Sequence, residues 1–277
     1  MRVCVLVSIP DTRFFSNCTL SLKTMRVGFP TSDIRVFINA IGLPEDIRRA
    51  ELLAREGGAS HVQIEKNRLH LADWIRGCVE QCSDEAGPLV TLDGDLHWWG
   101  SCEDWKFDAP MAGFYCPEMF NDWAQCRSMP RLHTSFLWFS RPRSLLEQLK
   151  KAYPWTGEYA PYNPFMGSVQ YLNGEPLFWD VCANLYNTLG GAHFGPEHLA
   201  LFEHLNSAGF VEEMAKRLGG LTGENFKLYH SIAPGNPALM KEWGWPMVSK
   251  YYARKRIEAA VLGNPARLAV DQMKWTG

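Results

Sequence analysis

The first third of the chain alternates short apolar runs with amphipathic stretches. The run VCVLVSI at 3–9 is rich in β-branched residues and ends at a proline, which is typical of a strand buried on both faces of a parallel sheet. Further apolar runs predict strands at 34–41, 61–65 and 88–92. Between the runs, apolar residues recur at helical spacing and predict helices at 14–25, 44–58 and 69–82.

This β-α-β-α-β-α-β order predicts an α/β fold. Parallel strands joined by right-handed helical crossovers form a Rossmann-like open sheet, mostly parallel and flanked by helices. Sheets of this kind bind their ligands at the carboxyl ends of the strands. We therefore expect functional residues where the predicted strands end.

The second half of the chain is less regular. Its pattern predicts a strand at 134–140, a helix at 142–153, a helix at 178–189 with Asp180 in its first turn, and further helix at 195–220. No internal repeat, low-complexity tract or clean linker interrupts the sequence. We therefore expect a single domain, 1–277, with an irregular, helix-rich C-terminal part.

Composition narrows the class of protein. The 277 residues are 46% apolar, enough to fill a core, and the net charge of −2 gives no overall attraction to nucleic acid or to an acidic membrane surface. The eight cysteines are spread without paired CxxC motifs, as expected for buried thiols in a reducing cytoplasm. The first apolar run is too short for a signal peptide, and no run approaches the ~18 residues of a membrane span. We expect a cytoplasmic protein.

Two aspartates stand at the end of the fourth predicted strand. In GPLVTLDGDLHWW (87–99), Asp93 and Asp95 repel each other and lose hydration near the core, so a cation or a set of hydrogen-bond donors has to offset the cost. A carboxylate pair at this edge suits Mg²⁺ or Mn²⁺, with positions left for a diphosphate. The alternative is an Asp-Gly-Asp turn whose carboxylates cap backbone amides.

The motif LVTLDGDLHWW in this position resembles the Asp-x-Asp motif of the GT-A glycosyltransferases, which use nucleotide-sugar donors. The resemblance covers residues 1–140 in organisation, where 5–24 looks like the first strand, nucleotide loop and helix, and 34–42 like the second strand. It implies a nucleotide-binding half at 1–140 and an acceptor-binding and C-terminal half at 141–277. It also implies a divalent cation and a hydroxyl-bearing acceptor that the sequence does not name.

The resemblance also assigns roles to the donor side. It makes Asp95 the direct metal ligand and places Asp93 nearest the ribose and the water molecules bound to the metal. Contacts to the base would come from Ser8, Pro10, Asp11 and Asn39, with Asp73 nearby. The alternatives are a strand-ending turn residue for Asn39 and a solvated helix position for Asp73.

Further roles fall on the second half of the chain. The resemblance implies that a late histidine, His230, completes the metal site and that Asp180 is the general base of an inverting transfer, although Asp180 could instead complement a helix dipole. His133 is a second candidate, for contact with the transferred sugar. Trp98 and Trp99 could cover the donor or an acceptor ring, or belong to the core.

Three other functions stay open. A sugar-nucleotide nucleotidyltransferase would need a glycine-rich, basic segment after the first strand, where SIPDTRFF has no glycine. A metal-dependent phosphodiesterase or nuclease would need more ligands for a second metal, such as His97 and Glu103. A non-catalytic carbohydrate-binding protein with a vestigial metal site is the third.

Overall fold

A computed structural model gives the fold of the chain. It describes residues 1–8, 12–41, 43–83, 87–98, 100–121, 126–152, 164–199 and 201–204. The chain divides into two compact units, Met1–Glu203 and His204–Gly277, and all of the described residues except His204 belong to the first. Pro10, Asp11, Trp99 and His230 lie outside the described residues.

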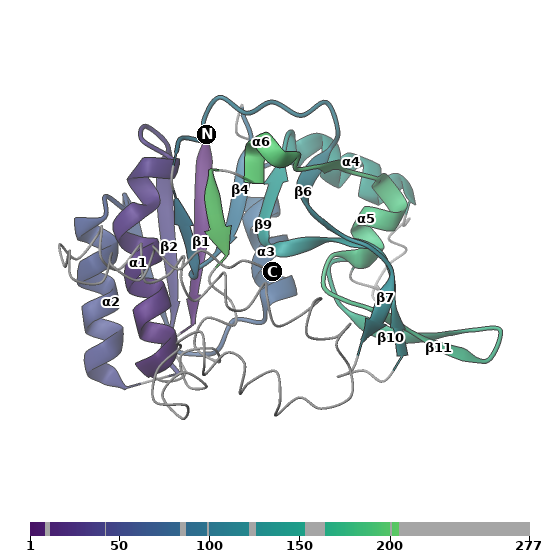
Figure 1. The fold of residues 1–277 in the computed structure, drawn as a ribbon, viewed down its shortest axis with the longest axis horizontal. Helices are drawn as coiled ribbons and strands as arrows, with labels where there is room; N and C mark the ends of the chain where they lie inside the picture. Colours follow the sequence, from purple (N-terminus) through teal and green to yellow (C-terminus); the bar gives the residue numbers. More distant parts are fainter. Residues whose placement is uncertain are drawn as a thin grey trace, which may run out of the picture. The chain divides into compact units, whose positions relative to one another are not determined.

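The main sheet has seven strands in the order β12-β6-β9-β4-β1-β2-β3 (Figure 1). Its strands are β1 (Arg2–Ser8), β2 (Asp33–Asn39), β3 (His61–Glu65), β4 (Leu89–Asp93), β6 (Met111–Cys116), β9 (Arg131–Phe139) and β12 (Ala192–His193). All pairings are parallel except those of β9, which runs antiparallel to both β4 and β6. The four strands predicted in the first third are confirmed, and they pair in parallel.

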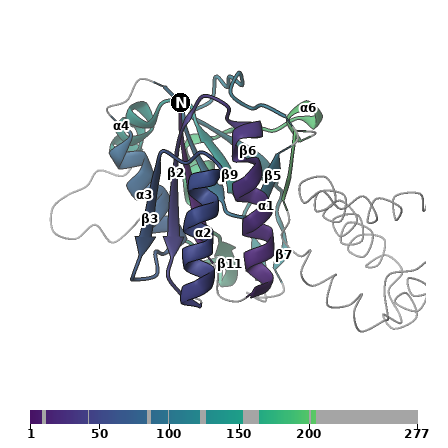
Figure 2. The same ribbon diagram turned by 90° about the vertical axis from the view of Figure 1, so that its left-hand side faces the viewer.

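Helices cover both faces of this sheet. They are α1 (Thr12–Gly28), α2 (Pro44–Glu56), α3 (Leu71–Gln81), α4 (Pro142–Ala152), α5 (Ala183–Leu189) and the short α6 (Pro196–Leu199). Apolar residues of α1 and α2 fill one core cluster, and those of α3, α4 and α5 fill the other. Figure 2 shows α1 and α2 on one side of the strands and α3 and α4 on the opposite side. The fold is therefore the expected α/β fold, a Rossmann-like, mostly parallel sheet between helical layers.

Two smaller sheets extend this framework. One pairs β5 (Leu96–Trp98) with β13 (Phe202–His204). The other has the order β10-β11-β8-β7, formed by β7 (Met119–Asn121), β8 (Cys126–Ser128), β10 (Ser168–Leu172) and β11 (Glu175–Trp179). Asn173 and Gly174 connect β10 to β11 with φ angles of 53° and 84°, which are typical of a type I′ hairpin turn. This four-stranded sheet is called the small sheet from here on.

Two helix predictions in the second half were wrong at particular residues. Phe178 and Trp179 belong to β11, and helix α5 begins only at Ala183, so Asp180 precedes the helix instead of lying in its first turn. Cys182, the N-cap residue, has a left-handed φ of 63°, which cannot continue a helix toward Asp180. Within the predicted helix 195–220, the described residues 202–204 form β13 because they pair with β5.

The cysteines lie as the sequence pattern predicts. All eight cysteines are free, and seven of them are buried, with Cys116 partly exposed. In the part of the chain that the structure describes, no helix combines the length and the apolar character that crossing a membrane requires.

The carboxylate of Glu103 fixes the turn that leads into β2. Its Oε1 accepts hydrogen bonds from the backbone N–H of Thr31 (2.8 Å) and of Ser32 (2.6 Å) and from Ser32 Oγ (2.6 Å), and its Oε2 accepts from Thr31 Oγ1 (2.8 Å). Partial burial raises the pKa of Glu103, but the hydrogen bonds from Ser32 and Thr31 outweigh burial and lower it below its ordinary value of 4.5. The charged form is therefore the one that the fold favours.

Replacing this carboxylate should cost stability only while it is charged. Because the folded-state pKa is lowered, the stabilisation is present above the ordinary glutamate pKa and is lost as the pH falls through the folded value. We expect Glu103→Gln to lower the melting temperature at neutral pH, and the difference from wild type to shrink on acidification. Thermal unfolding across the acid range measures this, with Glu56→Gln on the exposed side of α2 as the control. A difference that does not change with pH would contradict the assignment.

Candidate metal centre

The two aspartates flank the end of the central strand β4. Asp93 is the last residue of β4 and lies opposite Leu6 of β1, and Asp95 immediately precedes β5. Strand β4 runs between β1 and β9, so both aspartates lie at the carboxyl end of parallel strands. The pattern in the sequence predicted this position, and it is the edge where such sheets bind ligands.

Gly94 lets the chain turn tightly between the two aspartates. A Cβ atom at this position would lie 3.0 Å from Val7 Cγ2, 3.1 Å from the carbonyl oxygen of Leu6 and 3.1 Å from Val7 Cα. Two of these three atoms belong to the backbone of β1, which cannot move aside by changing a rotamer. The close approach of the turn to β1 therefore favours glycine at this position.

A third potential ligand is His204, the last residue of β13. One ligand atom each from Asp93, Asp95 and His204 lie within 4.8 Å of one another, and all three residues are partly exposed. Ligands on opposite sides of a divalent ion with bonds of ~2.0–2.4 Å are separated by about 4–5 Å. The spacing and the donor set, two carboxylates and an imidazole, therefore fit a single divalent cation.

Strand pairing and aromatic packing position His204. Strand β13 pairs with β5, and the backbone N–H of Gly100 donates to the carbonyl of Leu201 at 3.3 Å. Phe202, two residues before the histidine, is 8% exposed and packs on Trp98 with ring centroids 5.7 Å apart. The histidine is thus carried to the aspartates by a strand whose buried face is anchored in the core.

The acid pair also acts on its surroundings. Burial, together with the negative charges of Asp95 and Asp93, raises the pKa of the Cys18 thiol on α1. The aspartate charges are therefore felt on the neighbouring helix. A cation held by the two carboxylates would reduce both this field and their mutual repulsion.

The expected base-contacting residues form part of a buried network. Asn39 is 1% exposed, and its Nδ2 donates to Ser8 Oγ at 2.9 Å while its Oδ1 accepts from the backbone N–H of Leu69 at 2.9 Å. The amide therefore ties the ends of β1 and β2 to the segment that enters α3. Asp73 lies on the surface of α3 and pairs with Arg76, Oδ1 to Nη2 at 3.3 Å.

His133 lies close to the aspartates along strand β9. Leu92 pairs with Phe136, and extending this register by one residue brings Asp93 opposite Ser135. His133 lies two residues further on, about 7 Å along an extended strand. Its Nδ1 is 2.8 Å from Ser135 Oγ, and the backbone N–H of Ser135 donates to the same nitrogen at 3.2 Å.

Asp180 is held by an arginine from the same strand. Its Oδ2 lies 2.6 Å from Nη2 of Arg131, and its Oδ1 accepts from the backbone N–H of Val181 at 2.8 Å. Arg131 begins β9, four residues or about 13 Å along the strand from Ser135. The sequence pattern identified Asp180 but not its ion-pair partner.

Of the residues suggested for a second metal, one is held by other groups and the other is buried. The Glu103 carboxylate is bound to residues 31–32, as described above, and His97 is 2% exposed, with burial lowering its pKa to about 4. Trp98 is 2% exposed and packs edge-to-face on Phe29, so it belongs to the core and cannot cover a donor. Among the described residues, the acid pair gains one further ligand and not two.

Two functional candidates could not be read from the sequence. His204 lies in a stretch whose apolar spacing predicted a helix. Arg131 lies just before the predicted strand 134–140, in a segment without a helix or strand pattern. The one available signal for His204 was its position two residues after the apolar run 199–202. Whether His230 contributes is a prediction that falls outside the described residues.

The close packing of Gly94 predicts the effect of a single methyl group. Gly94→Ala should destabilise the fold by about 1–3 kcal/mol and weaken Mn²⁺ binding, because the turn must move away from β1. Chemical denaturation and metal titration measure the two effects. Gly77→Ala on α3 is the matched control, since a Cβ there meets nothing within 4 Å and the substitution favours helix. Equal stability of the two variants would contradict the close-packing argument.

The chain has weak likenesses among known proteins. No protein-family model matches it, and a search of curated proteins finds no match. The solved structure of the bifunctional glycosyltransferase WbbM aligns with a TM-score of 0.43 and 10% identity, over 70% of this chain and 38% of its own. This chain thus spans well under half of that enzyme.

Two further solved structures show the same level of similarity. The galactosyltransferase LgtC aligns with a TM-score of 0.38 and 13% identity, over 70% of this chain and 73% of its own. A nucleoside-diphosphate-sugar pyrophosphorylase from Vibrio cholerae RC9 aligns with a TM-score of 0.39 and 11% identity, over 72% of this chain and 93% of its own. Solved structures similar to this chain thus include glycosyltransferases and a sugar-nucleotide enzyme, and we infer its function from its own residues.

Proposed function

We propose that this chain is a metal-dependent glycosyltransferase that moves a sugar from a nucleotide-sugar donor to an acceptor hydroxyl. The observation that carries the proposal is the grouping of Asp93, Asp95 and His204 within 4.8 Å at the carboxyl end of β4. Three protein ligands leave coordination positions for a diphosphate. The same Asp-x-Asp pattern at the end of the fourth strand is the basis of the resemblance to GT-A glycosyltransferases.

The donor set favours Mn²⁺ over Mg²⁺. Magnesium prefers oxygen ligands and retains several waters, whereas manganese takes carboxylates and lies nearer the metals that imidazole suits. When bound, such a cation would neutralise charge on the diphosphate as it leaves the sugar. The role of Asp93 and Asp95 is then to hold the donor's diphosphate at the end of β4.

We assign binding of the donor's nucleoside to the ends of strands β1 and β2. Ser8 is the last residue of β1, which neighbours β4, and Asn39 is the last residue of β2. The hydrogen bond between their side chains makes this edge of the sheet rigid. Because both polar groups of the Asn39 amide are used within the protein, we assign it to shaping the base pocket. Ser8 and the following residues would make the direct contacts.

We assign Asp180 as the group that accepts the proton of the acceptor hydroxyl, and we place His133 next to the transferred sugar. The order along β9 supports this division, since His133 is nearer to the aspartates than Arg131, which holds Asp180. A carboxylate has about four lone-pair positions, so one that accepts from Arg131 and Val181 can still accept from a hydroxyl. Arg131 would fix the orientation of Asp180 for this step.

Removing a metal ligand tests the proposal directly. Asp95→Asn and His204→Ala should each weaken Mn²⁺-dependent binding of a nucleoside diphosphate by more than about tenfold while the fold is retained. Calorimetric titrations of Mn²⁺ with UDP, GDP and ADP measure this. Asp104→Asn and His61→Ala, which change exposed side chains outside the cluster, are the matched controls. Unchanged affinity in Asp95→Asn would exclude the metal site.

Product analysis separates the proposed function from its alternatives. A glycosyltransferase releases a nucleoside diphosphate from a nucleotide sugar, whereas a nucleotidyltransferase exchanges pyrophosphate with it. A non-catalytic binding protein would hold the nucleotide without turning over the donor, with or without Mn²⁺. Release of the diphosphate that depends on Mn²⁺ and on Asp95 would therefore identify the transferase.

The role of Asp180 has its own test. As a general base, Asp180→Asn should slow turnover by ~10²–10⁴-fold with donor binding nearly unchanged. If the carboxylate only pairs with Arg131, the variant should lose stability while turnover is largely kept. Steady-state kinetics and a melting curve on this variant distinguish the two, with Arg131→Lys as the variant that keeps the charge but not the planar pairing. Product NMR that shows retained anomeric configuration would exclude the base role.

A further inference from the structure

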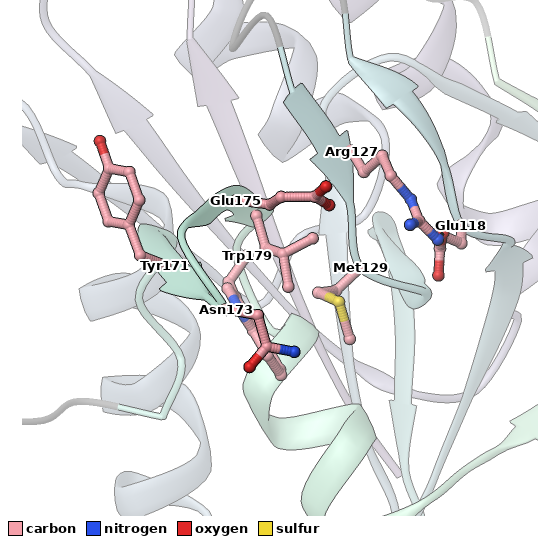
Figure 3. Close-up of a pocket in the computed structure, with 8 residues that line it drawn as sticks. Glu118, Arg127, Met129, Tyr171, Asn173, Glu175 and Trp179 are labelled. Atoms are coloured by element: carbon pink, nitrogen blue, oxygen red, sulfur yellow. Dashed lines mark ion pairs between the residues drawn. The ribbon is translucent and has the colours of Figure 1, made fainter.

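The small sheet carries a pocket that none of the roles above uses. The pocket has a volume of about 480 Å³, within the range of small-molecule sites. Its lining comes from all four strands or their ends and includes Glu118, Arg127, Met129, Glu175, Leu177 and Trp179. Figure 3 shows Glu118, Arg127, Glu175 and Trp179 around Met129, with Tyr171 pointing away from them.

Strand register explains why these residues share one face. Glu175, Leu177 and Trp179 alternate along β11, so they point to the same side of the sheet. Leu177 lies opposite Arg127 of the parallel strand β8, which puts Arg127 on that side too. Met129, two residues after Arg127, continues the same face. The floor of the pocket is therefore apolar, formed by Met129 and Leu177, and its rim is polar.

The charges on the rim disfavour an anionic ligand. Arg127 is already paired with Glu118, with side-chain exposed fractions of 59% and 41%, and Glu175 adds a second carboxylate. Both acids would repel a phosphate or a nucleotide, and the single guanidinium is shared. Carboxylates accept hydrogen bonds and a guanidinium donates them, which suits a neutral ligand with many hydroxyl groups.

Trp179 supplies a second, independent indication of a ligand. The residue is partly exposed in the pocket, yet its indole Nε1 is buried and makes no hydrogen bond to any described residue. A buried donor without a partner is costly, and the indole ring offers an apolar face beside it. A pyranose matches the exposed part of this residue, because its C–H face packs on an aromatic ring while its hydroxyls reach the polar groups of the rim.

We propose that this pocket binds a neutral saccharide. The proposal gives the acceptor a chemical class and rests on the proposed function for that assignment alone, since saccharide binding itself needs neither metal nor donor. Trp179 directly precedes Asp180, the assigned base, so a saccharide in the pocket adjoins the residue that would receive the acceptor proton. The pocket then holds the acceptor at the end of β11.

The NMR signal of the Trp179 indole N–H reports directly on binding in the pocket. This signal is identified by its loss in Trp179→Phe, and we expect it to shift when lactose, cellobiose or maltotriose is added in the presence of a chelator. Trp179→Phe keeps an aromatic ring but offers a smaller face for the sugar to pack on, and should weaken binding of the same sugar about two- to tenfold. Glu175→Gln should weaken it by a similar factor, because a charged acceptor is replaced by a neutral amide.

Matched control variants distinguish a loss of sugar binding in the pocket from a general effect of the substitution on the protein. Trp74→Phe is the control for Trp179→Phe, because it changes a buried indole on α3 outside the pocket. Glu56→Gln on α2 is the control for Glu175→Gln, and both control variants should bind the sugar as wild type does. Sialyllactose, which adds a carboxylate to lactose, should bind more weakly than lactose. Equal loss in Trp74→Phe, or stronger binding of sialyllactose, would overturn the assignment.

We expect sugar binding in the pocket to be independent of the metal site. Asp95→Asn should leave the sugar-induced shift unchanged, and sugar binding without Mn²⁺-dependent nucleotide binding would support the pocket while rejecting the transferase. If none of the three neutral sugars shifts the Trp179 signal at millimolar concentration, the pocket proposal is wrong, whatever the nucleotide titrations show.

Discussion

Repulsion between two carboxylates at the end of a buried strand is the constraint around which the rest of the site is arranged. Asp93 and Asp95 are separated by one residue, and glycine is favoured there because the turn lies against the backbone of β1. Strand β4 is paired on both sides up to Leu92, and Asp93 also pairs with Leu6 of β1, which limits how far the turn can move to separate the charges. The fold thus keeps in place an arrangement that favours a positive ion.

Local patterns in the sequence predicted the parts of the molecule that local patterns determine. The β-branched runs of β1, β2 and β4 and the apolar stripes of α2 and α3 are confirmed, and the position of Asp93 and Asp95 follows from them. His204 escaped prediction because its strand forms only by pairing with β5, a segment far away in the sequence. Asp180 was misplaced because the left-handed residue Cys182 starts α5 late, and a positive φ at a cysteine has no sequence signature.

Strand β9 links the parts of the proposed reaction. It runs antiparallel to both of its neighbours, and its printed pairing with β4 ends at Phe136, whereas its first residue, Arg131, still pairs with Cys116 at the end of β6. From this segment, His133 and Arg131 project beyond the strand that carries the aspartates, and Arg131 holds Asp180 from the end of β11. A single antiparallel strand thus connects the edge assigned to the donor with the sheet assigned to the acceptor.

The pairing of β13 with β5 also sets the order in which the site can form during folding. The two aspartates come from neighbouring positions, but His204 is more than a hundred residues further along the chain, and closing so long a loop carries an entropic cost. The parallel core can assemble before this closure, whereas the complete ligand set exists only after it. Metal binding would then stabilise the last stage of folding selectively, so that the cation shifts the equilibrium toward chains in which β13 has docked.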